Sequence, residues 1–306
     1  MRILITGGTG FIGTRLVAEL QSEKHELTVL VRDYAKARLR LGASPELVRS
    51  LDEIDHGSHF DAVINLAGAS IADKRWTQAR KRLLLSSRLQ TTTALVQLFQ
   101  RLRRPPAVML SASAVGFYGA HGVQPLTETS PVHDEFSHEL CKRWEEEARK
   151  AESLDIRVCI MRFGVVLGPA GGMLGRLLPI FRLGLGGRIG DGEQMLSWVH
   201  RDDVIKAMRF LLASEAESGV FNVTAPAAVN NLEFTRVLAA GVKRPALLPL
   251  PAPIVQLMFG EMGDRLLLHG QNVTPARLQA LGFEFKYPDL RSAVSACLCD
   301  SESNKG

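Results

Sequence analysis

Cysteine is scarce in this chain of 306 residues, and its four copies follow no functional pattern. Cys141, Cys159, Cys297 and Cys299 have neither the paired spacing of a zinc site nor the regular spacing of a disulfide framework. A single residue separates the last two, which is too close for a redox Cys-x-x-Cys pair. We therefore expect reduced thiols, no bound metal and a cytoplasmic location.

Long apolar stretches and long runs of positive charge are also missing. No segment of about 18 uninterrupted apolar residues occurs, so a membrane span is not expected. The first residues have the pattern of a strand rather than of a signal peptide. The formal net charge is +5, but acidic residues lie between the basic ones, which disfavours nucleic acid as a partner. An anionic small ligand explains the positive balance better.

Apolar strands and amphipathic helices alternate through the first half of the chain. Strands are predicted at Arg2–Thr6, Glu26–Val31, Leu47–Leu51, Asp61–Leu66, Ala107–Ala112 and Ile156–Arg162. Helices are predicted at Phe11–Gln21, Ser86–Arg103 and Glu135–Ser153. Strands separated by helices pair in parallel through right-handed crossovers. The expected fold is an α/β, Rossmann-like, doubly wound parallel sheet with a small C-terminal substrate-side lobe.

The alternation breaks near Gly164. Gly168–Gly192 is rich in glycine and proline and carries an amphipathic centre, which is typical of a lid or substrate-side insertion. Further on, strands are predicted at Met195–Val199 and Val220–Val223, with a helix at Asp202–Ala213. We expect a Rossmann domain over residues 1–167, to which 200–225 returns. The substrate-side lobe then comprises 168–199 and 226–300.

A glycine-rich loop follows the first strand and opens the first helix. Gly7 permits the tight turn, Gly10 lets the backbone approach a pyrophosphate, and Gly13 allows close helix–sheet packing. The anion then meets the free N–H groups and the positive dipole end of a helix. The loop therefore predicts dinucleotide binding. The residues expected to contact the cofactor here are Gly7, Thr9, Gly10, Phe11, Ile12 and Gly13.

The residue at the end of the second strand indicates which dinucleotide is bound. An acid at this point accepts the ribose 2′-OH of NAD, whereas an arginine pairs with the 2′-phosphate of NADP. Arg32 stands there, and Lys36, Arg38 and Arg40 add positive charge. Asp33 leaves NAD open, because a shift of one residue makes it the acid of an NAD site. We favour NADP as the cofactor.

Four segments, of which the first is the glycine-rich loop, resemble one protein superfamily. They are TGGTGFIG at 6–13, NLAG at 65–68, SASAVGFYG at 111–119 and RFGVVLGP at 162–169. Together they resemble the extended short-chain dehydrogenase/reductases, in the NAD(P)-dependent epimerase/dehydratase branch. IADKRW at 71–76, FRLGLGGRIGDGEQ at 181–194, WVHRDDV at 198–204 and TPARLQALGFEF at 274–285 are similar to one subgroup. These are the epimerase-family, cell-division-inhibitor-like proteins, which lack an assigned substrate.

The resemblance implies further cofactor contacts. Leu66 and Ala67 are expected to line the adenosine side, with Gly68 of the same segment beside them. Arg88 holds a position where extended members usually carry asparagine, and it is similar to a cofactor contact of the subgroup. Val166 is expected to approach the nicotinamide end through its backbone.

The resemblance also implies a catalytic pattern, from which this sequence departs. Active members use a serine or threonine, then Tyr-x-x-x-Lys on one face of a helix. The cation lowers the pKa of the phenol, which then exchanges a proton with the substrate hydroxyl. Ser113 fits the serine, with Ser111 as the fallback, and Lys142 fits the lysine. His138 stands where the tyrosine belongs.

Three interpretations of this departure stay open. His138 replaces the tyrosine as acid and base; or Tyr118, His200 or Asp134 handles the proton; or the protein binds NADP without turnover. The leading hypothesis is an NADP-dependent oxidoreductase or epimerase-like protein acting on an unidentified small polar substrate, nucleotide-linked ones included. The alternative is a catalytically impaired NADP-binding regulatory module. A homodimer is compatible with either.

Three arginines are candidates for binding an anionic group of the substrate. They are Arg162, Arg182 and Arg188, and a salt bridge explains each of them almost as well. The sequence names neither the substrate nor the direction of the reaction.

Overall fold

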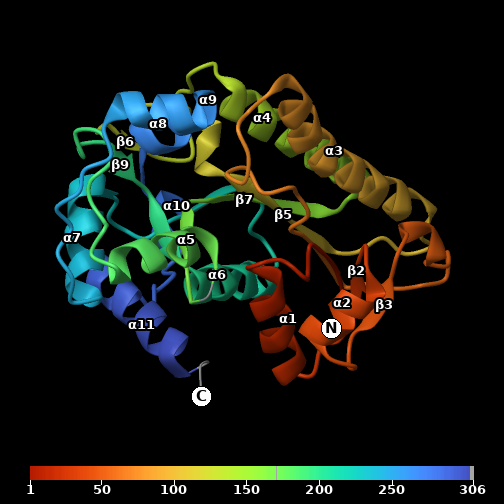
Figure 1. The fold of residues 1–306 in the computed structure, drawn as a ribbon. Helices are drawn as coiled ribbons and strands as arrows, with labels where there is room; N and C mark the ends of the chain where they lie inside the picture. The colour runs from red at the N-terminus through yellow and green to blue at the C-terminus, as the bar shows by residue number, and fades with distance from the viewer. Residues whose placement is uncertain (170, 304–306) are drawn as a thin grey trace.

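A seven-stranded parallel sheet forms the centre of the molecule (Figure 1). The computed structural model describes residues 1–169 and 171–303. From one edge to the other, the strands are β11 (Gly219–Val223), β7 (Arg157–Phe163), β5 (Val108–Ala114), β4 (Ala62–Asn65), β1 (Arg2–Thr6), β2 (Glu26–Leu30) and β3 (Glu46–Val48). The strand order reverses between β1 and β4, and every pairing is parallel. The predicted Rossmann-like, doubly wound sheet is confirmed.

Helices cover both faces of the sheet (Figure 1). One face carries α1 (Gly13–Ser22), α2 (Tyr34–Leu41) and α6 (Arg201–Ala213), and the other carries α3 (Gln78–Arg101) and α4 (Phe136–Arg149). Side chains alternate between the two layers, so that Ile3 and Ile5 of β1 pack toward α1 while Leu4 packs toward α3. Burial on both faces explains why these strands are continuous apolar runs.

Three predicted elements have different bounds in the structure. The third strand ends at Val48, because Ser50 caps a short 3₁₀ helix that begins at Leu51. Helix α3 begins at Gln78 instead of Ser86, since the Thr77 hydroxyl accepts a 3.1 Å hydrogen bond from the Arg80 N–H. The strand predicted at Met195–Val199 is divided into β9 (Met195–Leu196) and β10 (Trp198–His200).

The rest of the chain forms short strand pairs and a helical lobe. The pairs are β8 (Val165–Leu167) with β10, β12 (Val229–Asn230) with β9, and β13 (Asn272–Val273) with β6 (Pro125–Leu126). The helices are α5 (Gly172–Arg182), α7 (Asn231–Gly241), α8 (Ala252–Phe259), α9 (Glu261–Gly263), α10 (Ala276–Ala280) and α11 (Leu290–Ser303). Among the described residues, no helix combines the length and the apolar character needed to cross a membrane.

The C-terminal segment does not belong wholly to the lobe. Leu278 and Phe283 are buried in the same cluster as the core of the main sheet. The buried carboxylate of Asp203 in α6 accepts hydrogen bonds of 2.6 and 3.0 Å from the N–H groups of Lys286 and Tyr287. Part of the segment predicted as the substrate-side lobe, around α10, thus packs against the core of the main sheet.

Asn65, the last residue of β4, ties the carboxyl ends of three strands together. Its Oδ1 accepts a 2.7 Å hydrogen bond from Thr6 of β1, and its Nδ2 donates to Thr92 of α3 at 2.9 Å. A longer contact of 3.4 Å reaches Ser111 of β5. The Ala67 N–H donates to the same Oδ1, at 3.4 Å. All four side chains are buried, so the amide fixes the turn after β4 at the point where the strand order reverses.

Replacing this amide tests its structural role. We expect Asn65→Leu to lower the free energy of unfolding by about 2–3 kcal/mol, because Thr6 and Thr92 lose their buried partner. Urea unfolding followed by circular dichroism measures the change. The matched control is Gln97→Leu at an exposed position of α3, which is expected to change stability by less than about 0.5 kcal/mol. Equal stabilities of the two variants would contradict this role.

Candidate functional site

The turn between β1 and α1 depends on two glycines that leave no room for a side chain. Gly7 has a φ of 71°, and a Cβ built on it would lie 2.5 Å from the Leu66 carbonyl oxygen. A Cβ on Gly13 would lie 2.3 Å from the Gly7 carbonyl oxygen. At Gly10 the added Cβ meets only that oxygen, at 3.2 Å. The turn is thus closed against β4 and open at Gly10, which suits backbone approach to a phosphate.

The N-terminus of α1 is available to an anion. Ile12 is the N-cap residue, so no side chain caps the helix, and its first turn holds no acidic residue. The Gly10 N–H is turned back onto the Gly7 carbonyl oxygen at 3.0 Å, which keeps the loop compact. The N–H groups of the first helical turn therefore have no side-chain acceptor from a cap. They lie, with the positive end of the helix dipole, at the end of the sheet.

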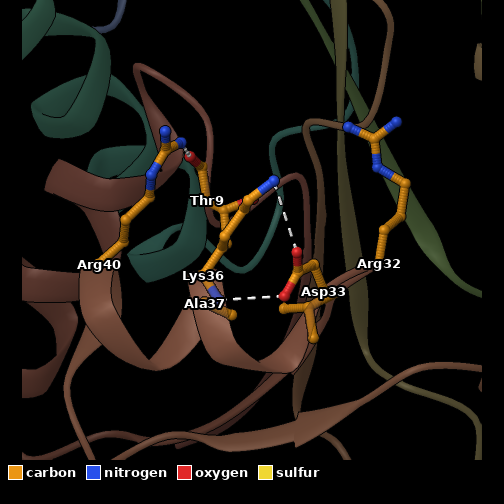
Figure 2. A pocket seen from close by; sticks show the side chains of 7 residues that line it. Thr9, Arg32, Asp33, Lys36, Ala37 and Arg40 are labelled. Carbon is orange, nitrogen blue, oxygen red and sulfur yellow. Dashed lines mark hydrogen bonds and ion pairs between the residues drawn. The ribbon is translucent and has the colours of Figure 1, made fainter.

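A pocket of about 350 Å³ lies beside this loop, between β2 and α2 (Figure 2). Its lining comprises Thr9, Val31, Arg32, Asp33, Lys36, Ala37 and Arg40. Arg40 donates a 2.8 Å hydrogen bond to the Thr9 carbonyl oxygen and so joins α2 to the loop. Three cations and one carboxylate make the pocket strongly positive, as a site for a phosphate group requires.

The one carboxylate of the pocket is already engaged. Asp33 is the N-cap of α2, and its Oδ1 accepts a 3.1 Å hydrogen bond from the Lys36 N–H. This backbone hydrogen bond, helped by the Lys36 ammonium 3.6 Å away, holds the pKa of Asp33 below its usual value. Arg32 is exposed, and no hydrogen bond or ion pair joins it to another described residue. Figure 2 shows its guanidinium directed away from Asp33 and from Arg40.

Arg88 of α3 lies at the end of β4, against the NLAG segment. A Cβ on Gly68 would lie 3.1 Å from the guanidinium carbon of Arg88, so a side chain there would crowd the guanidinium. Arg88 donates a 3.0 Å hydrogen bond to the Leu84 carbonyl oxygen, and its guanidinium carbon lies 5.0 Å from the centre of the Trp144 ring. Burial lowers the pKa of Arg88. Arg88 thus packs against the segment that contains Leu66 and Ala67.

Phe11 connects the glycine-rich loop to the segment that follows β8. Its ring lies against three glycines from the end of β8 to the start of α5, where added Cβ atoms would come within 3.0 Å at Gly168, 2.5 Å at Gly171 and 3.0 Å at Gly172. Val166 of β8 precedes these glycines, and its carbonyl oxygen lies 3.0 Å from a Cβ built on Gly172. The first turn of α5 therefore packs on a side chain of the loop.

The Ser113 hydroxyl is hydrogen-bonded to a buried ion pair. It donates a 2.6 Å hydrogen bond to Oε1 of Glu145 on α4. Glu145 accepts two further hydrogen bonds from Arg162 of β7, at 2.9 Å from Nε and 2.8 Å from Nη2. Arg162 also donates to the Tyr118 hydroxyl at 3.0 Å. Arg162 thus forms the salt bridge that the sequence allows for it.

The buried face of α4 that meets Ser113 carries three residues that are not among the predicted catalytic ones. Ser137, Cys141 and Glu145 are buried and spaced by four, so they form one column along the helix. Burial, with the charge of Glu145, raises the pKa of Cys141 to about 11, against the opposing influence of Arg88 and of hydrogen-bonding contacts with Ser113 and Ala114. The Cys141 thiol is therefore protonated at neutral pH and is neither a base nor a ready nucleophile.

The predicted catalytic group of Ser113, His138 and Lys142 stays a prediction. The Nδ1 atom of the buried His138 lies 2.6 Å from the Phe117 carbonyl oxygen, and Lys142 is exposed. In the described part of the chain, no hydrogen bond joins either residue to Ser113. Cys141 and Glu145, which are not among the predicted catalytic residues, lie on the buried column of α4.

No hydrogen bond among the described residues joins the alternative proton donors directly to Ser113. Tyr118 is fully buried and donates a 2.7 Å hydrogen bond to Asn222, and burial raises its pKa. The Nδ1 atom of His200 accepts a hydrogen bond from the Asp202 N–H and so caps α6. Asp134 is exposed on the segment before α4.

The contact between Phe11 and Gly171 predicts a specific clash. We expect Gly171→Ala to lower the free energy of unfolding by about 1–3 kcal/mol, because the new methyl group overlaps the ring. Gly57→Ala is the control, since no atom lies within 4 Å of a Cβ built there. In a protein that already carries Phe11→Ala, the further substitution Gly171→Ala should no longer lower the free energy of unfolding. A cost that persists without the ring would show that the clash lies elsewhere.

Comparison with known proteins places this geometry in a family. The model of the NAD dependent epimerase/dehydratase family matches residues 3–224. Residues 250–297 match a domain of unknown function, DUF1731. The chain is 37% identical to the chloroplastic epimerase family protein SDR39U1 homolog of Arabidopsis thaliana, over 97% of this chain and 87% of that protein. It is 38% identical to the epimerase family protein Mb2239 of Mycobacterium bovis, covering 95% and 96% of the two chains.

A solved structure is similar along the whole chain. The crystal structure of human epimerase family protein SDR39U1 (isoform 2) with NADPH superposes with a TM-score of 0.88. The two sequences are 34% identical, and the match covers 99% of each chain. These findings confirm the resemblance to the epimerase/dehydratase branch and to its epimerase-family subgroup.

Proposed function

The chain belongs to the NAD dependent epimerase/dehydratase family, and we propose that it binds NADP(H) in the crevice between β1 and β4. This crevice lies where the strand order reverses, which is the usual ligand position in open α/β sheets. The pyrophosphate would lie on the uncapped N-terminus of α1. When bound, the nicotinamide supplies or accepts a hydride. The residues proposed to hold the cofactor are Gly7, Thr9, Gly10, Phe11, Ile12, Gly13, Arg32, Leu66, Ala67, Gly68, Arg88 and Val166.

One observation carries the choice of NADP over NAD. The Asp33 carboxylate is held by the N–H and the ammonium of Lys36 as the cap of α2. It is therefore not placed to accept the ribose hydroxyls of NAD. Arg32 stands at the same pocket with its guanidinium open, and a 2′-phosphate would give it a charged partner. The human SDR39U1 structure contains NADPH, which supports the same choice.

The geometry favours binding without the superfamily's proton transfer. The column that faces Ser113 presents a hydroxyl and a protonated thiol, at Ser137 and Cys141, in place of tyrosine and lysine. Ser113 itself donates to Glu145. We therefore propose an NADP(H)-binding module, whose occupancy regulates contacts of the protein, as the primary function.

A second candidate is an oxidoreductase or epimerase-like enzyme acting on a small polar substrate. The lid supports it, since α5 begins directly on Phe11 and would cover a ligand bound beside the nicotinamide. Oxidation of NADPH can be followed while sugar nucleotides and small carbonyl compounds are added. The binding module predicts no oxidation with any of them. Turnover that is lost in Ser113→Ala would establish the enzyme instead.

We also propose that the protein is cytoplasmic and that it can form a homodimer. Cys141 and Cys159 are buried thiols outside any disulfide, which fits a reducing compartment such as the cytoplasm. Homodimers are compatible with this function, because the cofactor crevice is formed by residues of a single chain.

The Arg32 guanidinium is expected to determine cofactor preference. Fluorescence titration should show tighter binding of NADPH than of NADH, and Arg32→Ala should weaken NADPH binding about tenfold, the loss of a charged hydrogen bond. Binding of NADH should change little, because it lacks the 2′-phosphate. The matched control is Arg104→Ala, an exposed arginine outside the pocket. Equal affinity of the wild-type protein for both cofactors, or a preference that survives in Arg32→Ala, would refute the choice of NADP.

A further inference from the structure

Helices α3 and α4 are held in a defined register beside the crevice. The Trp144 indole N–H donates a 3.2 Å hydrogen bond to the Thr92 hydroxyl. Arg88 lies one turn before Thr92 on α3, and its guanidinium lies over the same Trp144 ring. Cys141 lies nearly one turn before Trp144 on α4. Arg88 therefore lies level with Cys141, and the two groups interact electrostatically.

Cys141 occupies the point where the superfamily pattern places a cation. Ser137 and Cys141 have the four-residue spacing of the missing Tyr-x-x-x-Lys pair, and their column faces Ser113 on β5. The thiol is neutral, so α4 contributes no positive charge at this point. The positive charge that acts on this thiol comes from the neighbouring helix, at Arg88.

Most of the hydrogen-bonding capacity of Arg88 is not used inside the protein. A guanidinium has five N–H donors, and one of them is donated to the Leu84 carbonyl oxygen. No carboxylate of the described residues lies within salt-bridge distance of Arg88. The side chain is packed between Gly68 and Trp144, so its direction is set without an acidic partner. A largely buried cation of this kind is stabilised when a ligand supplies acceptor oxygens.

We propose that Arg88 supplies, from α3, the cation that α4 lacks, and binds the hydroxyl and carbonyl oxygens of the nicotinamide half of NADP(H). This inference rests on the proposed binding of NADP(H). Because a guanidinium stays protonated at any physiological pH, Arg88 holds this half of the cofactor and does not relay protons. Arg88 would thus hold NADP(H) in place without relaying protons, which agrees with the NADP(H)-binding module proposed above.

Two probes separate this inference from the function on which it rests. NADPH contains both halves of the cofactor, whereas 2′,5′-ADP contains only the adenosine half with its 2′-phosphate. In Arg88→Gln, we expect the dissociation constant of NADPH to rise about tenfold, as for the loss of a charged hydrogen bond. The dissociation constant of 2′,5′-ADP should stay unchanged. Calorimetric titration measures both.

Two further variants complete the experiment. Arg82→Gln, at an exposed position of the same helix, should bind both probes like the wild-type protein. Arg88→Lys retains the charge without the fork of donors, and we expect an intermediate loss for NADPH alone. It also serves in place of Arg88→Gln if that variant does not fold, as judged by circular dichroism.

Three outcomes would overturn one proposal or the other. Unchanged NADPH binding in both Arg88 variants would refute a role for Arg88 at the nicotinamide half. An equal loss for NADPH and 2′,5′-ADP would place its effect at the adenosine half or on the fold. A wild-type protein that binds neither probe would refute the proposed function itself.

Discussion

The site depends on one close approach, in which the backbone of Gly7 lies directly against that of Leu66. A side chain at Gly7 would come within 2.5 Å of the Leu66 carbonyl oxygen, so any other residue would separate the first turn from the end of β4. Asn65 holds that end of β4 in place through its hydrogen bonds to Thr6 and Thr92. Gly13 then allows α1 to begin immediately beyond the turn. These contacts fix how β1, β4 and the start of α1 meet at the point where the strand order reverses.

A second constraint organises the opposite side of the crevice. Glu145 and Arg162 form a two-point ion pair whose side chains are 5% and 4% exposed, and Ser113 donates to the same carboxylate. A buried pair of this kind is costly to break, because removing one partner leaves the other charge without compensation. It fixes α4 against β5 and β7 and directs Cys141 toward Ser113. Ser113 is thus part of a buried hydrogen-bond network that joins β5, α4 and β7.

Much of the fold could be predicted from the sequence, because its signals are local. Buried strands appear as apolar runs, and Gly7 and Gly13 mark a turn whose geometry only glycine allows. The confirmed sheet and the family follow from those signals. Arg32 could be recognised as well, since its place at the end of a strand is set by the chain itself.

The register of α4 could not be predicted in the same way. Which side of a helix faces a strand depends on packing between distant segments, here on the ion pair between Glu145 and Arg162. The lysine motif indicates Lys142, which is exposed, whereas the buried column of the same helix includes Cys141. The return of α10 to the main sheet also depends on long-range contacts, those of Leu278 and Phe283.

We infer that NADP(H) binds beside a face of α4 that lacks the tyrosine and lysine of the superfamily's proton-transfer pair. A crystal structure of the protein with NADP⁺ tests it most directly. The account predicts the 2′-phosphate at Arg32, the pyrophosphate at the N-terminus of α1 and the nicotinamide half beside Arg88. His138 and Lys142 should lie outside contact distance of the nicotinamide. A cofactor bound with its 2′-phosphate away from Arg32, or a nicotinamide in contact with His138 and Lys142, would contradict the account.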